Sequence, residues 1–309
     1  MKMRIGIDLG GTSATVGIVD NKYKVLCKSS IITSDCRTEK ALFDKIEECI
    51  YDLMDNSNVT LKDIESIGFG SPGSVDIESG ITRRAGNLPL RNTPVVKILK
   101  DEFGKDVYLD NDANCAVWGE YNAGVAKEYN NVVMVTLGTG IGGGIIIDGK
   151  ILHGKDNRAG EVGHVVIDIN GKRCSCGRIG CWETLASTRA LIERVKLEAE
   201  HAPYSTLGNV IADDNGIVDG KTLFTAMKLG CNVAKSIFMD YVKLLGIGIL
   251  NIIDVLRPDI IVLGGGISKE GNTLLDPVLN YIGETSTLIK TSTLNDDSGI
   301  IGAALLYLK

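Results

Sequence analysis

Six side chains suited to binding a metal ion or a sugar lie within the short segment between residues 160 and 183. Three thiols and one imidazole are typical ligands of a tetrahedral zinc ion, because both groups match its softness and geometry. These four are His164, Cys174, Cys176 and Cys181. Two carboxylates, Glu161 and Glu183, could accept hydrogen bonds from a polyhydroxylated ligand. The alternative is a glycine-rich loop with free thiols and surface acids, but the third cysteine and the nearby histidine favour a metal.

Three glycine-rich turns follow segments that are expected to form strands. They are Gly10-Gly11-Thr12, Gly138-Thr139-Gly140 and Gly264-Gly265-Gly266. Backbone N–H groups in the first two could bind terminal phosphates, and the bare backbone of the third could lie against a base and ribose. Asp8, at the end of the first expected strand, could hold Mg²⁺ directly or through water. None of the turns matches GxxxxGK[ST] or strand–GxGxxG–helix, and ordinary tight turns are the alternative.

A candidate general base, Asp112, stands where an expected strand gives way to an expected helix in the run LDNDAN. Phosphoryl transfer needs such a group to accept the proton of the acceptor hydroxyl, and its pKa need not be raised much because that proton leaves late. Asn111 beside it could bind sugar hydroxyls. The alternative for Asp112 is a plain helix N-cap, which is a common role for Asp at a helix start.

The composition is that of an ordinary globular enzyme that is not built for nucleic acid. The chain has 309 residues, 44% hydrophobic residues and a formal net charge of −6, so a basic footprint for nucleic acid is missing. No secretory signal opens it, and apolar runs such as 244–250 are too short to span a membrane. Eight cysteines in a chain of this length fit a reducing compartment better than a disulfide framework. We therefore expect a cytoplasmic protein with no membrane partner.

The residue pattern predicts two mixed α/β lobes with a similar beginning. The first 120 residues suggest three strands, then a helix near 38–54, a strand near 64–69, a helix begun by Thr93 and Pro94, a strand and a helix. A second strand–glycine turn–strand unit starts near residue 131, which indicates an internal repeat. We expect a small lobe of residues 1–120, with the helix 298–309 packing back on it, and a large lobe of residues 121–297.

The second half is predicted to be rich in helices. A single helix is expected from residue 183 to residue 200, then an exposed polar loop or insertion over 201–220. A long helical region over 221–255 is expected to break near Gly230 and Gly246. A buried strand before Gly264 and helices near 273–282 and 299–309 complete the chain.

Together these motifs resemble the ROK family of sugar kinases and repressors over the whole chain. The runs that carry the resemblance are DLGGT at 8–12, NDAN at 111–114, LGTGIGGG at 137–144, EVGH at 161–164 and CSCGRIGCWE at 174–183. Each run alone is a modest signal, but their order is specific. The resemblance implies the actin/hexokinase-like ATPase fold, with two ribonuclease-H-like lobes around a cleft.

Within the family the chain looks most like bacterial glucokinases, which transfer phosphate from ATP to the 6-hydroxyl of glucose with Mg²⁺. The resemblance implies that Asp112 is the base and that the zinc is structural. It implies sugar contacts from Gly73, Asn87, Asn111, Asp112, Glu161, His164 and Glu183. A hexose, ATP and a second copy of the chain, as homodimer or homotetramer, are the expected partners, and a step of glycolysis is the expected setting.

Several alternatives stay open from the sequence. A kinase for N-acetylmannosamine or N-acetylglucosamine shares the same motifs, and Ser74 and Leu90 depart from the family pattern on the sugar side. Fructose is disfavoured because AGE rather than HPE precedes the GH pair. A sugar-sensing regulator is disfavoured because no helix-turn-helix precedes DLGGT, and an actin-like filament protein would not need the cysteine cluster.

Overall fold

The computed structural model describes residues 2–86 and 88–309, which form two compact units. Unit 1 comprises residues 1–134, 144–160 and 292–309, and unit 2 comprises residues 135–143 and 161–291. The expected sugar contact Asn87 lies outside the described residues. The division into a small lobe of residues 1–120 with 298–309 and a large lobe of residues 121–297 stays a prediction.

Unit 1 is built on a five-stranded sheet with the order β3-β2-β1-β4-β8. β1 pairs antiparallel with β2 and parallel with β4, and β8 extends the sheet in parallel. The strands are β1 (Met3–Leu9), β2 (Ser13–Val19), β3 (Val25–Ile32), β4 (Ile64–Ser71) and β8 (Asp106–Asn111). Consecutive apolar residues in β1 and β4 are buried on both faces, as is usual for strands in the middle of a sheet.

The helices α1 (Glu39–Asn56) and α2 (Val95–Phe103) pack on this sheet. Apolar side chains at helical spacing, among them Leu42, Ile46 and Leu53, bury one face of α1, and the Thr38 side chain caps it. The expectation that Thr93 caps α2 is wrong, because Thr93 belongs to a strand of a small sheet that the sequence analysis missed. That sheet comprises β5 (Ser74–Asp76), β6 (Ile81–Arg84) and β7 (Arg91–Thr93).

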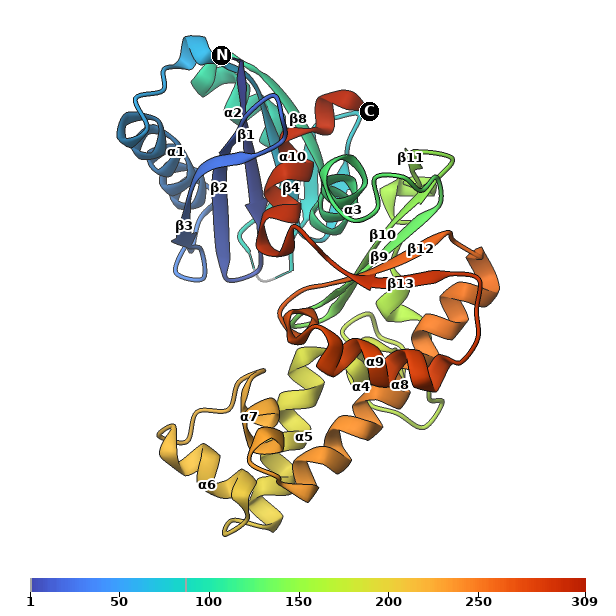
Figure 1. Cartoon of the computed structure of the whole chain (residues 1–309). Coiled ribbons are helices and arrows are strands. Elements are labelled where there is room, and N and C mark those ends of the chain that lie inside the picture. The colour runs from blue at the N-terminus through green and yellow to red at the C-terminus, as the bar shows by residue number, and fades with distance from the viewer. Residues whose placement is uncertain (1, 87) are drawn as a thin grey trace. The chain divides into compact units, whose positions relative to one another are not determined.

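The C-terminal helix α10 (Ser298–Ala304) lies against β1 and β4 and beside α3 (Asp112–Ala123), as Figure 1 shows. Glycines make this close approach possible. A Cβ on Gly68 would lie 1.7 Å from the carbonyl oxygen of Ala303, and one on Gly302 would lie 1.6 Å from that of Cys115. The backbones of β4, α10 and α3 therefore touch directly, which positions the start of α3.

A second five-stranded sheet repeats the strand order of the first, as β11-β10-β9-β12-β13. Its strands are β9 (Val132–Leu137), β10 (Ile141–Ile147), β11 (Lys150–Ile151), β12 (Ile260–Gly264) and β13 (Leu288–Thr291). In both sheets three consecutive strands lie side by side. Two later strands then extend the sheet next to the first of the three. The internal repeat expected from the sequence is confirmed, and mixed sheets of this kind are those of the actin/hexokinase-like fold.

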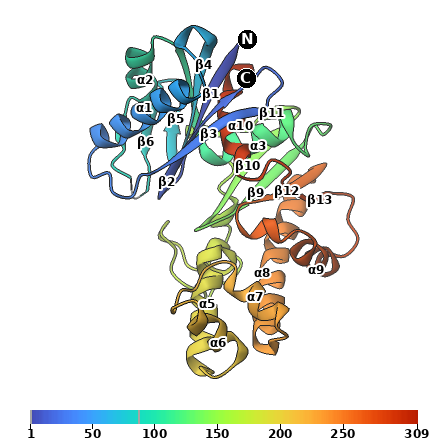
Figure 2. The same cartoon turned by 60° about the vertical axis from the view of Figure 1, so that its left-hand side comes forward.

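Unit 2 carries the helices α4 to α9, of which α5, α6, α7 and α8 pack on one another (Figure 2). Their bounds are α4 (Glu183–Ala186), α5 (Thr188–His201), α6 (Thr206–Asp213), α7 (Thr222–Lys228), α8 (Asn232–Leu256) and α9 (Asn272–Ile282). The single helix expected from residue 183 is broken at Ser187, which caps α5. The loop expected over 201–220 contains α6, which begins after its own cap, Ser205.

The expected break at Gly246 is wrong, since α8 runs through it. Glycine there serves packing: a Cβ on Gly246 would lie 2.3 Å from the Tyr281 ring, and one on Gly248 would lie 2.0 Å from the Trp182 ring. By length and hydropathy α8 could cross a membrane, whereas the sequence analysis considered only uninterrupted apolar runs such as residues 244–250. More than half of the window concerned is buried inside the protein, as in the core helix of a globular domain.

We predict that Gly68→Ala destabilises unit 1 by about 2–3 kcal/mol, because the methyl group must displace backbone rather than a mobile side chain. Gly11→Ala is the control for stability, since a Cβ on Gly11 meets no atom within 4 Å. Thermal and denaturant unfolding would measure both. Equal midpoints for the two variants would contradict the backbone-contact interpretation of α10.

Candidate functional site

In unit 1, the first of the three glycine-rich turns, Gly10-Gly11-Thr12, connects β1 and β2. The N–H of Gly10 donates to the carbonyl of Ser13, and the carbonyl of Thr12 accepts from Thr33, which closes the turn and leaves Gly11 exposed. Asp8 is in β1, two residues before Gly10, and its carboxylate lies against Gly299. A Cβ on Gly299 would lie 2.3 Å from that carboxylate. The turn and the carboxylate expected for phosphate and Mg²⁺ are thus neighbours in unit 1.

Asp8 is an energetically unfavourable carboxylate in the protein alone. Burial, with a smaller contribution from the nearby Asp296, raises the pKa of Asp8 to about 6. A bound divalent cation would favour the ionised carboxylate, since carboxylate oxygen is a preferred Mg²⁺ ligand. This combination of burial and uncompensated charge is common where a group is kept for function rather than for stability.

The strand–helix corner between β8 and α3 holds the candidate base. Asn111, not Asp112, is the N-cap of α3: its Oδ1 accepts from the N–H groups of Ala113 at 2.9 Å and Asn114 at 3.3 Å. Its Nδ2 donates to the carbonyl of Gly73 at 3.2 Å. Asp112 is the first helical residue, and its Oδ1 also accepts from Ala113 N. The structure therefore groups Gly73, Asn111 and Asp112, and the capping role belongs to Asn111.

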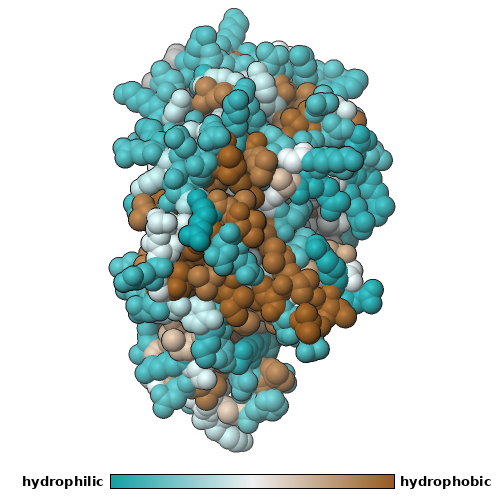
Figure 3. All heavy atoms as spheres, turned by 90° about the vertical axis from the view of Figure 1, so that its right-hand side faces the viewer, coloured by the Kyte–Doolittle hydropathy of each residue, from teal (hydrophilic) through white to brown (hydrophobic). Residues whose placement is uncertain are grey.

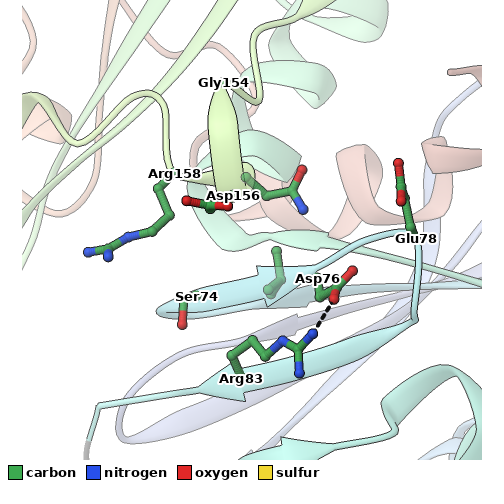
Figure 4. A pocket seen from close by; sticks show the side chains of 9 residues that line it. Ser74, Asp76, Glu78, Arg83, Gly154, Asp156 and Arg158 are labelled. Carbon is green, nitrogen blue, oxygen red and sulfur yellow. Dashed lines mark hydrogen bonds and ion pairs between the residues drawn. The ribbon is translucent and has the colours of Figure 1, made fainter.

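A polar cavity of about 460 Å³, which the sequence analysis missed, borders the Gly73 loop in unit 1. Figure 4 shows Asp76 and Arg83 paired on neighbouring strands, at 2.5 Å, with Asp156 and Arg158 on the facing loop. Its lining comprises Ser74, Val75, Asp76, Glu78, Arg83, Gly154, Asp156, Asn157 and Arg158. Only the tertiary packing of β5 and β6 on residues 154–158 creates this cavity, so no local motif predicts it.

In unit 2, the glycine turn between β9 and β10 adjoins the one after β12. The N–H of Gly138 donates to the carbonyl of Gly140 at 3.0 Å, and the N–H of Thr188 donates to that of Gly138 at 2.9 Å. A Cβ on Gly265 would lie 2.4 Å from the carbonyl oxygen of Leu137, so only glycine allows the two turns to touch. The two expected nucleotide segments of this unit are therefore side by side.

A cavity of about 290 Å³ opens beside the second of these turns. It is lined by Thr188, Asp219, Gly220, Lys221, Gly266, Ile267, Lys269 and Glu270. Of these residues, only Gly266 was expected from the sequence to be part of a site. Asp219 and Gly220 end the segment expected to be an exposed polar loop or insertion, and Lys221 begins the expected helical region, so the local pattern does not reveal what these residues face.

The zinc-type side chains converge in unit 2 as their spacing predicted. One donor atom from each of His164, Cys174, Cys176 and Cys181 lies within 4.8 Å of all the others. Sγ of Cys174 is 3.5 Å from Nδ1 of His164, and Sγ of Cys176 is 3.5 Å from Sγ of Cys181. Sulfur ligands of one tetrahedral zinc, with Zn–S bonds near 2.3 Å, stand about 3.8 Å apart, so the donor set fits the ion.

The protonation of these thiols also depends on their surroundings. Hydrogen bonds from the backbone and side chain of Arg178 lower the pKa of Cys176 to about 6. Burial raises the pKa of Cys181 to about 12 and also raises that of Cys174. The set therefore has one thiol ready to ionise and two that would ionise when they bind a cation.

The two candidate sugar carboxylates flank the histidine of this cluster. Oε2 of Glu161 is 3.7 Å from Nε2 of His164, and Oε1 of Glu183 is 3.6 Å from Nδ1 of the same ring. Oε1 of Glu183 also accepts from the Cys174 thiol at 3.0 Å. A Cβ on Gly140 would lie 2.6 Å from Oε2 of Glu183. Glu183 thus touches both the thiol cluster and the glycine turn between β9 and β10.

Comparisons with known proteins show the family to which the chain belongs. A profile of the ROK family matches residues 4–309. The chain belongs to the ROK family. It is 38% identical to the glucokinase of Thermotoga maritima, covering 97% of this chain and 95% of that protein. The glucokinase of Halalkalibacterium halodurans is 32% identical, covering 98% and 94%. A crystal structure of a ROK family glucokinase from Streptomyces griseus, in complex with glucose and AMPPNP, superposes with a TM-score of 0.87 at 30% identity, covering 98% of both chains.

We predict that Asp8→Asn stabilises the protein free of Mg²⁺ and nucleotide at about pH 8, by roughly 1–3 kcal/mol. The folded-state pKa of Asp8, about 6, lies above the unfolded value, so the carboxylate lowers stability increasingly between pH 4 and 6 and fully above that range. The gain from the substitution should shrink as the pH falls from about 8 to about 5. Denaturant unfolding of both proteins across this range measures it, and a gain independent of pH would contradict the assignment.

Proposed function

We propose that this ROK family protein is an ATP-dependent hexose kinase that prefers glucose and phosphorylates its 6-hydroxyl. The observation that carries the proposal is the likeness to glucokinases over nearly the whole chain. An in-line phosphoryl transfer requires positioning and charge neutralisation more than covalent help from the protein.

In the proposed mechanism Asp112 accepts the proton of the sugar hydroxyl as the phosphoryl group arrives. Its support is its place as the first residue of α3, with Asn111 taking over the capping of that helix. Asn111 and the Gly73 loop hold sugar hydroxyls from unit 1, and Asn87 is proposed to join them. Glu161, His164 and Glu183 are proposed as further sugar contacts, and they are supported by the two carboxylates that flank the His164 ring.

The nucleotide is proposed to use the glycine turns. Those at residues 10–12 and 138–140 bind phosphates through backbone N–H groups, and residues 264–266 face the adenosine. The cavity lined by Thr188, Lys221 and Lys269 beside Gly266 supports an adenosine subsite, because it combines apolar walls with a few polar groups. Asp8 is proposed to hold Mg²⁺, whose charge would neutralise the phosphates when it is bound.

A structural zinc is proposed for the Cys/His cluster. Bound there, it would hold the loop of residues 164–181 to one conformation and so keep His164 and Glu183 in fixed positions. A cytoplasmic setting in carbohydrate metabolism, at the entry to glycolysis, agrees with this role and with the eight free thiols of the chain.

A homodimer or homotetramer remains a prediction that light scattering would check. It is supported by the face shown in Figure 3, the right-hand side of Figure 1 with β13 and the ends of α8 and α9, which carries a broad apolar area. Exposed apolar side chains on these elements of unit 2 are Val255, Leu279, Tyr281 and Leu288. Contiguous exposed apolar surface commonly marks a protein–protein contact.

We predict that purified protein contains about one zinc ion per chain. Cys176→Ser should lose the metal and lower the unfolding midpoint, because one of four ligands is gone. Cys231→Ser, a buried free thiol elsewhere in unit 2, is the matched control and should keep the zinc. Elemental analysis of the three proteins decides the matter: fully active protein without metal would refute the site.

We predict that Asp112→Asn lowers turnover about a hundredfold or more and leaves sugar binding largely intact, since a general base contributes to the transition state rather than to the ground state. A coupled ADP assay and titration calorimetry measure the two effects. Asp101→Asn, an exposed carboxylate on α2, serves as the control. Retained turnover in Asp112→Asn would exclude it as the base.

The proposed substrate is tested by comparing kcat/KM for glucose, mannose, fructose, N-acetylglucosamine and N-acetylmannosamine with ATP. The highest value for glucose supports the proposal. A preference for an N-acetylated hexosamine would instead favour a kinase for N-acetylmannosamine or N-acetylglucosamine. Sugar binding without any ATP consumption would favour a regulator.

A further inference from the structure

Asp110 is a fully buried carboxylate in unit 1, two residues before the proposed base. Its Oδ1 accepts from the N–H of Asn111 at 2.6 Å and from Nδ2 of Asn114 at 2.9 Å. Its Oδ2 faces Nε2 of His153 at 2.8 Å and forms an ion pair with Nζ of Lys309. Each oxygen of this carboxylate therefore has two partners.

These contacts enclose the strand–helix corner that carries Asp112. Asn111 and Asn114 stand on either side of it in the first turn of α3, and Asp110 binds both. Asn111 in turn reaches the carbonyl of Gly73. Because the residue before Asp112 and the residue two after it are both fixed, the backbone of Asp112 has little freedom, and this backbone sets where the side chain starts.

His153 connects the same carboxylate to a second part of the site. Burial lowers the pKa of His153, so the neutral ring donates a single N–H to Asp110. Its own carbonyl accepts from the N–H of Ala159 at 2.9 Å, which closes the loop after β11. This loop is the last stretch of unit 1 before the chain enters unit 2 at Glu161, a proposed sugar contact. The Asp110–His153 pair thus anchors the segment that leads to Glu161.

We propose that Asp110 is a positioning residue for the phosphoryl transfer, acting through Asn111 and Asn114 on Asp112, with His153 as its working partner. The inference rests on the proposed kinase function. A buried carboxylate is costly to bring out of water, and a neutral residue would be the simpler choice if stability alone mattered. The four partners offset that cost, and they restrain a corner where a displacement of about 1 Å can lower a rate a hundredfold.

The matched comparison is with Glu120, the other fully buried carboxylate of the same region. Glu120 lies farther along α3. Its carboxylate accepts from four donors: Val125 N at 2.9 Å, Leu294 N at 3.0 Å, the Thr293 hydroxyl at 3.3 Å and the Ser292 hydroxyl. Burial and number of partners are alike, but none of these partners adjoins Asp112. Glu120→Gln therefore reports the effect on stability alone.

The experiment compares Asp110→Asn with Glu120→Gln in the full chain. We expect both to lower the unfolding midpoint, and only Asp110→Asn to lower kcat, by about tenfold or more, with the KM for ATP changed by less than about twofold. His153→Ala should lower kcat several-fold and His153→Gln should restore part of it, because the Gln amide can donate to Asp110. Equal kcat for the two buried-acid variants, once corrected for folded fraction, would overturn the proposal.

Hydrogen exchange separates this proposal from the proposed function. In Asp110→Asn the amides of residues 111–114 should exchange faster than in the wild type, whereas in Glu120→Gln they should not. This readout needs no catalytic activity. A wild-type protein that phosphorylates no sugar would reject the kinase proposal, and unchanged exchange in Asp110→Asn would by itself reject the positioning role.

Discussion

The direct backbone contact between α10, the first sheet and α3 is the constraint on which the rest of unit 1 depends. Gly68 and Gly302 leave no room for a side chain at this contact, and Gly119 on α3 likewise meets the backbone of Ser298. Because backbone does not yield as a side chain does, the start of α3 is held at a fixed distance from β1 and β4. The corner with Asn111 and Asp112 is therefore held in place as well, because it forms the start of α3. The glycine turn after β1 is attached to the same sheet.

Three carboxylates near this corner show how environment assigns different tasks to one chemical group. Asp110 is fully buried and its carboxylate has four partners, so it holds the residues around it in place. Asp8 is enclosed, and burial raises its pKa, as is common for groups kept for function. Asp112 stands at the helix start, with its capping task taken by Asn111. Side chains of one chemical type thus differ in protonation and role because their packing differs.

Much of the fold and site could be predicted from local pattern. The strand–turn–strand repeats, the cap Thr38 and the Cys/His spacing each follow from rules that act within a few residues, and the structure contains all of them. The misses share a cause. Gly246 does not interrupt α8, because it packs against Tyr281 of α9. The helix α6 forms in a polar segment because it packs on α7. Local propensity cannot report a neighbour that is far away in the sequence.

By itself the sequence determined the chemistry available to this protein: which acids, thiols and glycines it has, and that their order is that of a ROK family sugar kinase. It also determined the duplicated sheet, because hydrophobic alternation and glycine turns are local signals. The tertiary structure decided what each group meets. The contact of Glu183 with Gly140, and the enclosure of Asp110 by His153 and Lys309, join residues that are tens to hundreds of positions apart. Such contacts arise from close packing of the whole chain, which no short window of sequence contains.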